Sequence, residues 1–372
     1  MNLNNDEITF ITELAKPERD KGYTRTFYSY PAKFQAKLPR GLIERYSSEG
    51  DLIFDPFVGG GTAGLEAMLL DRKFLGYDIN SFAIFISNVK TTYIDPSILK
   101  KNLKRFDLVF KEELKLNHDI LDFDDKICLG EKISSEINKI FDIIHQFSDN
   151  SVIRHFFELA LIHSIKIVGR RDFELRTGKD SQSITPIFFR KSTKMINEMS
   201  SLPKESLYQP KFILGSNHMI ELRDNSVDMI ITSPPYKDKD IEYQQIQIQR
   251  RSINRSKRSH VISTILGVNP LSKKDLCWTG RSGEEYWNNC RKSLKECDRV
   301  LKKNKFAFFW IGFKTLEDKK QFESQIQKAK LHICDTIPVT LSHDRAASGR
   351  STHHGRKTGM MSRDYLFITK KA

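Results

Sequence analysis

The chain has 372 residues, and its composition excludes several classes of protein before any motif is considered. Hydrophobic residues make up 39% and aromatic residues 10%, which excludes a wholly disordered chain, while 19 Gly and 12 Pro are too few for a fibrous or linker-like one. Lys and Arg outnumber Asp and Glu by 61 to 47, and the net charge of +14 favours a polyanion as partner. At about 150 residues per domain, the length predicts one large domain with insertions or two domains.

Cysteine usage and apolar runs indicate the compartment. The five cysteines include no CxxC pair, which argues against a disulfide framework and against a zinc site. His353 and His354 have no ligand-spaced partners either, so we expect no metal. The N-terminus lacks the pattern of a signal peptide, and the densest apolar run, residues 306–313, is far too short to span a membrane. We therefore expect a cytoplasmic protein.

The first clear elements lie just after residue 50. The apolar run 51–54 ends at Asp55, and after a Gly-rich turn the segment 63–70 carries apolar residues at the spacing of one helix face. Residues 74–80 form a second apolar run, with Asp78 near its end. This order predicts a strand, a helix and a second strand, which is a right-handed βαβ start to a parallel sheet.

A helical insertion is expected to interrupt the α/β fold. Apolar positions recur at helical spacing in residues 97–150, and residues 151–168 predict a longer amphipathic helix. We therefore assign residues 22–96 and 207–372 to one α/β domain and residues 97–206 to a largely helical insertion.

Further strands are expected in the second part of the α/β domain. Residues 211–215 and 227–232 predict strands, and the second must stop at the two prolines that follow it, which cannot continue a central ladder. Residues 285–313 indicate a helix, a turn and a strand, and residues 364–371 a final strand. Residues 237–285 are rich in Lys and Arg with few apolar residues to bury, so we expect a basic loop there.

The Gly-rich turn has the features of a nucleoside site. Gly59, Gly61 and Gly64 permit positive φ and let a ligand lie on the backbone at a helix N-terminus. Asp78 closes the next strand, where an acid accepts hydrogen bonds from ribose hydroxyls. A tight turn without a ligand and an NAD site are alternatives, but Asp55 stands where its carboxylate can meet an ammonium group. S-adenosylmethionine carries both an ammonium group and a ribose.

The loop Ser233-Pro234-Pro235-Tyr236 has features suited to a nucleobase amine. Two prolines remove backbone donors, so the loop presents acceptors beside an aromatic ring that can stack on a planar base. An exocyclic amine is a poor nucleophile because its lone pair is delocalised into the ring. Ser233 and the Pro234 carbonyl could accept its two hydrogens and aim the nitrogen at a methyl group. For the motif taken alone, a plain turn is the alternative.

Together these stretches resemble the amino-group DNA methyltransferases of restriction-modification type. The resemblance is carried by the segments 28–43, 55–80, 226–236, 299–312 and 364–371. It implies a Rossmann-like methyltransferase fold with a seven-stranded, mostly parallel sheet and a reversed C-terminal hairpin. It also implies S-adenosylmethionine as methyl donor and a flipped base of double-stranded DNA as substrate.

The resemblance assigns roles to individual residues. The cofactor contacts are Phe34, Asp55, Pro56, Phe57, Gly59, Gly61, Thr62 and Asp78, and the catalytic residues are Ser233, Pro234, Pro235 and Tyr236. A Ser at the first catalytic position usually accompanies cytosine N4 as target, so Ser233 favours this atom over adenine N6 or an RNA amino group. Cytosine C5 methylation is excluded, since no cysteine follows a proline. A protein-amine methyltransferase and a catalytically silent nucleic-acid binder are the remaining hypotheses.

The sequence departs from the family pattern near the preceding strand. Members commonly have Asp after the Gly that ends this strand, whereas here Ser216 and Asn217 follow it. The long interval between the motifs also leaves two candidates for DNA recognition, residues 97–206 and residues 237–285. The candidate DNA contacts are Arg170, Arg171, Arg250, Arg251, Arg255, Lys257 and Arg258, with a solvated loop as the alternative. The family also implies a cognate restriction endonuclease as partner.

Overall fold

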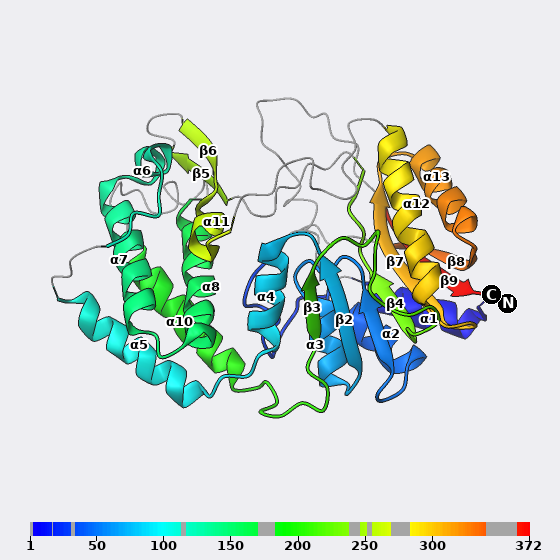
Figure 1. Cartoon of the computed structure of the whole chain (residues 1–372), viewed down its shortest axis with the longest axis horizontal. Helices are drawn as coiled ribbons and strands as arrows, with labels where there is room; N and C mark the ends of the chain where they lie inside the picture. The colour runs from blue at the N-terminus through cyan, green and yellow to red at the C-terminus, as the bar shows by residue number, and fades with distance from the viewer. Residues whose placement is uncertain are drawn as a thin grey trace.

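The computed structural model describes residues 3–16, 18–30, 34–112, 117–169, 183–237, 246–250, 255–268, 283–339 and 363–372. These residues form two lobes, an α/β lobe and a helical lobe that lie side by side (Figure 1). None of the described helices is long and apolar enough to cross a membrane.

One seven-stranded sheet forms the centre of the α/β lobe. Its strands, in spatial order, are β3 (Lys211–Leu214), β2 (Lys73–Asp78), β1 (Leu52–Asp55), β4 (Met229–Thr232), β7 (Phe306–Phe313), β9 (Arg363–Lys371) and β8 (Leu331–Val339). The first five are parallel, and β9 is antiparallel to both of its neighbours. The expected seven-stranded sheet with a reversed C-terminal hairpin is therefore confirmed. The strand order turns back between β1 and β4, which is where ligands bind in such sheets.

Helices cover both faces of this sheet. The helices of the lobe are α1 (Asn5–Leu14), α2 (Lys37–Tyr46), α3 (Thr62–Leu69), α4 (Ser81–Thr91), α12 (Gly283–Val300) and α13 (Leu316–Lys328). Alternate residues of β7 point to opposite faces, so Phe308 packs with α1, α2 and α3, whereas Phe309 packs with α12 and α13. Both faces are thus buried, as a largely parallel sheet requires.

The predicted helical insertion forms most of the second lobe. Its helices are α5 (Pro96–Phe110), α6 (Phe123–Leu129), α7 (Glu131–Phe147), α8 (Ser151–Val168) and α10 (Thr185–Met199). The bounds of α8 coincide with the predicted amphipathic helix. The lobe has its own apolar core, which also receives α4 and the N-terminal residues Phe27 and Tyr28.

The basic segment 237–285 differs from the loop that we expected. Residues Ile246–Arg250 (β5) and Arg255–Ser259 (β6) form an antiparallel hairpin, and Val261–Leu266 forms the short helix α11. Ile248 is fully buried in the core of the helical lobe, and Ser259 Oγ donates to Asp125 Oδ2 of α6 at 2.7 Å. The burial of Ile248 and Ser259 thus makes this basic segment part of the packed helical lobe.

The hairpin packs on the helical lobe. The described parts of the two candidate recognition regions, residues 97–206 and 237–285, therefore form one body. It lies on α6 and α8, at the end of the helical lobe that shares its side of the molecule with the carboxyl ends of the strands (Figure 1). The remaining parts of the segment, residues 238–245, 251–254 and 269–282, lie outside the described residues.

Candidate cofactor and catalytic site

The carboxyl ends of β1, β2 and β4 bring the two predicted motifs together. Asp55 ends β1, Asp78 ends β2, and Ser233 directly follows β4. Because β1 lies between β2 and β4, the two loops share one edge of the sheet. Thr232 Oγ1 donates to Asp55 Oδ1 at 2.6 Å, across 177 residues of sequence. Asp55 and the predicted catalytic loop therefore lie on the same side of the molecule.

Asp55 is a buried carboxylate with one occupied oxygen. Its side chain is only 2% exposed, and Oδ1 accepts from Thr232 Oγ1 and from the Phe57 amide at 2.9 Å. No donor among the described residues reaches Oδ2. Burial raises the pKa of Asp55 to about 7, against the opposing effect of these two hydrogen bonds. A cation placed beside Asp55 would favour its ionised form, so the site fits an ammonium ligand.

Asp78 fixes the glycine turn to the end of β2. Its Oδ2 accepts from the Gly59 amide and its Oδ1 from the Asn80 amide, both at 2.9 Å. Burial raises the pKa of Asp78 to about 6, although these amides oppose the shift. The carboxylate thus lies beside the turn, where its remaining lone pairs can accept from ribose hydroxyls.

Two glycines of the turn have a backbone that side chains rarely allow. Gly59 has φ +52° and Gly61 has φ +70°, and Gly61 is the N-cap of α3, directly before Thr62. A Cβ on Gly61 would lie 2.5 Å from Ser87 Oγ. From the same helix, the buried Lys90 Nζ donates to the Gly60 carbonyl at 2.7 Å. The turn is therefore packed tightly on α4, with no space for side chains at these positions.

Gly64 has a different role from the other two glycines. A Cβ there would lie 2.8 Å from Phe212 Cζ and 3.0 Å from Phe74 Cε1. This third glycine of the motif allows α3 to pack closely on β2 and β3, as the third glycine of such turns commonly does.

Asn217 is one of the two residues that follow Gly215, after which we expected the family pattern to have Asp. Its buried side chain donates from Nδ2 to the Pro56 carbonyl at 3.3 Å and accepts from Ser293 Oγ of α12 at 2.7 Å. Asn217 thus connects the loop after β3 with the loop after β1. Sequence analysis did not identify Ser293, which lies 76 residues away.

The N-terminal segment borders the glycine turn through Tyr30 and approaches β7 through Phe34. Asn80 Nδ2 donates to Tyr30 OH at 3.0 Å, and a Cβ on Gly59 would lie 3.2 Å from Tyr30 Cε1. Phe34 is buried and packs edge-on against Trp310, with ring centroids 6.1 Å apart. Tyr30 was not among the residues predicted for the site.

Two elements hold the predicted catalytic loop from outside. Tyr286 OH of α12 donates to the Pro235 carbonyl at 2.9 Å, and Tyr236 OH donates to Asp364 Oδ2 of β9 at 2.9 Å. Pro234 is buried, while Ser233 and Tyr236 are partly exposed. The loop is therefore held in place, yet two of its side chains remain accessible.

The structure describes only part of the predicted DNA contacts. Arg170, Arg171 and Arg251 lie outside the described residues. Arg250 and Arg255 are paired across the hairpin, and Lys257 and Arg258 follow on β6, with Arg258 exposed. These four residues therefore belong to the hairpin on the helical lobe.

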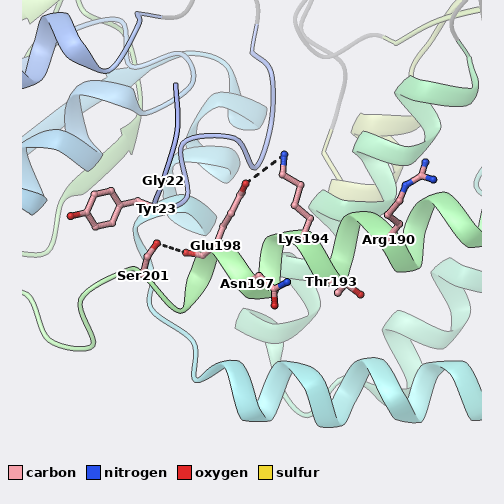
Figure 2. A pocket seen from close by; sticks show the side chains of 8 residues that line it. All are labelled: Gly22, Tyr23, Arg190, Thr193, Lys194, Asn197, Glu198 and Ser201. Atoms are coloured by element: carbon pink, nitrogen blue, oxygen red, sulfur yellow. Dashed lines mark hydrogen bonds and ion pairs between the residues drawn. The ribbon is translucent and has the colours of Figure 1, made fainter. Parts of the chain in front are cut away.

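A surface hollow of about 540 Å³ lies between the N-terminal segment and α10 (Figure 2). Its lining residues are Gly22, Tyr23, Arg190, Thr193, Lys194, Asn197, Glu198 and Ser201. Within it, Lys194 Nζ and Glu198 Oε1 form an ion pair at 3.6 Å. None of the predicted cofactor or catalytic residues lines this hollow.

Comparison with known proteins gives matches along much of the chain. An N6/N4 methyltransferase family model, described as DNA methylase, matches residues 7–89 and 227–356, and the interval between them contains α5 to α10. The Type II methyltransferase M.MvaI of Kocuria varians is 24% identical over 378 residues, covering 85% of this chain and 82% of the relative. The Type II methyltransferase M.BsoBI of Geobacillus stearothermophilus is 27% identical over 275 residues, covering 61% of this chain and 52% of the relative.

Proposed function

This chain belongs to the N6/N4 DNA methylase family, and we propose that it is the modification enzyme of a Type II restriction-modification system. Its methyl donor is S-adenosylmethionine. The proposed acceptor is the N4 amino group of a flipped cytosine at a specific site in duplex DNA. The observation that carries the proposal is the hydrogen bond from Thr232 to Asp55, which joins the cofactor turn to the catalytic loop.

The residues of the turn fit the donor. We assign Asp55 to the ammonium group, because a buried carboxylate with a raised pKa gains most from a neighbouring cation. Asp78 is assigned to the ribose hydroxyls. Pro56, Phe57, Gly59, Gly61 and Thr62 form the surface along which the methionine part would lie, and Phe34 would close it. When bound, the donor supplies a methyl group that is activated by the positive charge on its sulfur.

The catalytic loop fits a flat base with an amino group. Ser233 Oγ and the Pro234 carbonyl would accept the two amino hydrogens, which directs the nitrogen lone pair toward the methyl group. The Tyr236 ring would stack on the base, with Pro235 keeping the loop rigid. Transfer would form a nitrogen–methyl bond in place of the methyl–sulfur bond, and one amino proton would then pass to solvent. Ser233 supports cytosine N4, with adenine N6 as the alternative.

The helical lobe with its hairpin is the proposed DNA-reading unit. Arg250, Arg255, Lys257 and Arg258 are on a hairpin that lies on the same side of the molecule as the site, which supports their contact with DNA. Arg170, Arg171 and Arg251 remain proposed contacts on sequence grounds. A cognate restriction endonuclease that cuts the same site is the proposed partner.

Direct sequencing of DNA from cells that express the protein tests the proposal, because it identifies both the modified atom and its flanking sequence. We expect N4-methylcytosine at one short recurring site. N6-methyladenine at such a site would replace the proposed target by its alternative, and methylation of tRNA in preference to DNA would refute a DNA substrate.

A serine variant tests the mechanism. Ser233→Ala should reduce methyl transfer strongly while cofactor affinity stays near that of the wild type. Ser226→Ala is the matched control, since Ser226 lies before β4 at the opposite end of this strand and its hydroxyl donates only to the Arg223 carbonyl among the described residues. Unchanged turnover in Ser233→Ala would remove this residue from the mechanism.

A further inference from the structure

Asp364 is a buried carboxylate beside the catalytic loop, in a part of the sequence that the motifs do not mark. It is the second residue of β9 and pairs with Gly312 of β7. Because β9 is antiparallel to β7, its first residues lie at the carboxyl edge of the sheet, on the same side as Ser233. The side chain is 3% exposed.

One oxygen of Asp364 holds two aromatic side chains. Tyr236 OH and Trp310 Nε1 both donate to Oδ2, each at 2.9 Å. The other oxygen, Oδ1, is buried and accepts no hydrogen bond from the described residues. The carboxylate therefore connects the aromatic ring of the catalytic loop with the β7 residue that packs against Phe34.

Gly312 provides the space for this arrangement. A Cβ on Gly312 would lie 2.3 Å from Asp364 Oδ1 and 2.7 Å from Tyr236 Cε2. The Tyr236 ring thus lies close to the bare backbone of β7, and its hydroxyl is held by Asp364. With the Pro235 carbonyl bound by Tyr286, the ring is restrained at both ends.

Holding the Trp310 side chain in place would not by itself require a carboxylate at position 364. Trp310 requires one acceptor for its indole N–H, and a neutral side chain could supply it at a lower desolvation cost than a carboxylate. The additional partner is the ring that would stack on the target base. A charged acceptor forms a stronger and more directional hydrogen bond to a phenol than a neutral one does.

We propose that Asp364 is a positioning residue for methyl transfer, which fixes the plane of the Tyr236 ring and thereby the height of the stacked base relative to Ser233. The inference rests on the proposed function. Asp364 does not touch the reacting atoms. Its effect is geometric, and a displacement of about 1 Å at a reacting centre can reduce the rate by about 100-fold.

Single-turnover methyl transfer by Asp364→Asn, Tyr236→Phe and the double variant tests this role. We expect each single variant to slow transfer by about tenfold with little change in cofactor affinity or in KM for DNA, because the misplacement acts on the bound base. The double variant should be no slower than the slower single variant, since both changes act on the same hydrogen bond: Asp364→Asn replaces its charged acceptor with a neutral one, and Tyr236→Phe removes its donor. Thr369→Val is the matched control, because it removes a buried hydrogen bond between β9 and β7, to the Ala307 carbonyl, away from the loop. It should lower thermal stability and leave the transfer rate unchanged.

The outcomes separate this inference from the proposed function. Absence of DNA methylation by the wild type would refute the proposed function. If the wild type is active and Asp364→Asn transfers at its rate, or if the two single effects multiply in the double variant, the positioning role is refuted. If Asp364→Asn does not fold, Tyr236→Phe decides, because it leaves the bond between Trp310 and Asp364 intact, and an unchanged rate there overturns the inference.

Discussion

Replacing Asp55 with Asn should stabilise the cofactor-free protein while weakening cofactor binding. Burial raises the pKa of Asp55 from its ordinary value of 3.8 to about 7. At about 1.36 kcal/mol for each pH unit, this difference makes ionisation of the folded protein cost about 4 kcal/mol. Asn keeps an oxygen that can accept from Thr232 and Phe57, so the variant avoids this cost and retains the local hydrogen bonds.

The direction of the pH dependence of stability follows from the number of protons bound in the folded and unfolded states. The folded protein holds the Asp55 proton up to about pH 7, whereas the unfolded chain releases it near 3.8. The contribution of Asp55 to stability is therefore fully present below pH 3.8 and is lost as the pH rises through 7. The advantage of Asp55→Asn should reach up to about 4 kcal/mol at pH 8 and fall to about 2 kcal/mol at pH 5.

Urea unfolding of the cofactor-free wild type and variant at pH 5 and pH 8 measures this difference. Asp228→Asn is a control of opposite sign, because Lys302 overcomes the effect of burial and lowers the pKa of Asp228. That variant should lose stability at pH 8. Calorimetry should show at least about tenfold weaker binding of S-adenosylmethionine to Asp55→Asn, a loss of about 1.4 kcal/mol. A variant less stable than the wild type at pH 8, or a gain that is equal at both pH values, would refute the reasoning.

Three further predictions concern the glycine turn, an ion pair of α3 and the contact between the hairpin and the helical lobe. Gly61→Ala should lower stability by about 2 kcal/mol or more in thermal unfolding, because the new Cβ would clash with Ser87 in addition to straining the backbone. Gly267→Ala should cost only about 1 kcal/mol, because Gly267 has a similar φ of +63° but open space around it. An equal cost for the two would contradict this. Glu66→Gln should cost about 3 kcal/mol in urea unfolding, since Glu66 is fully buried and accepts from Arg25 Nε and Nη2 at 2.7 Å each. Ser259→Ala should weaken DNA binding in a mobility-shift assay and leave cofactor affinity unchanged; unaltered DNA binding would separate the hairpin from recognition.

Local patterns in the sequence predicted the elements that carry the two motifs. Glycines, consecutive prolines and the period of the apolar residues act over a few positions, so they were enough for β1, α3, β2, β4 and the long helix α8. The same signals did not reveal the hairpin β5–β6. Its net charge dominates the local pattern, and the burial of Ile248 depends on contacts with helices more than 80 residues earlier in the chain.

The sequence by itself determined which residues are candidates for the chemistry, namely the acids, glycines, serine and tyrosine of two short loops. Only the tertiary structure decided how these loops meet and what supports them. Asp55 accepts a hydrogen bond from Thr232, which lies 177 residues later in the chain, and Tyr236 donates one to Asp364, which lies 128 residues later. The order of strands in the sheet brings these partners together, because it places β4 beside β1 and the start of β9 beside β7. Strand order depends on the packing of the whole lobe, so no pattern within a single segment contains it.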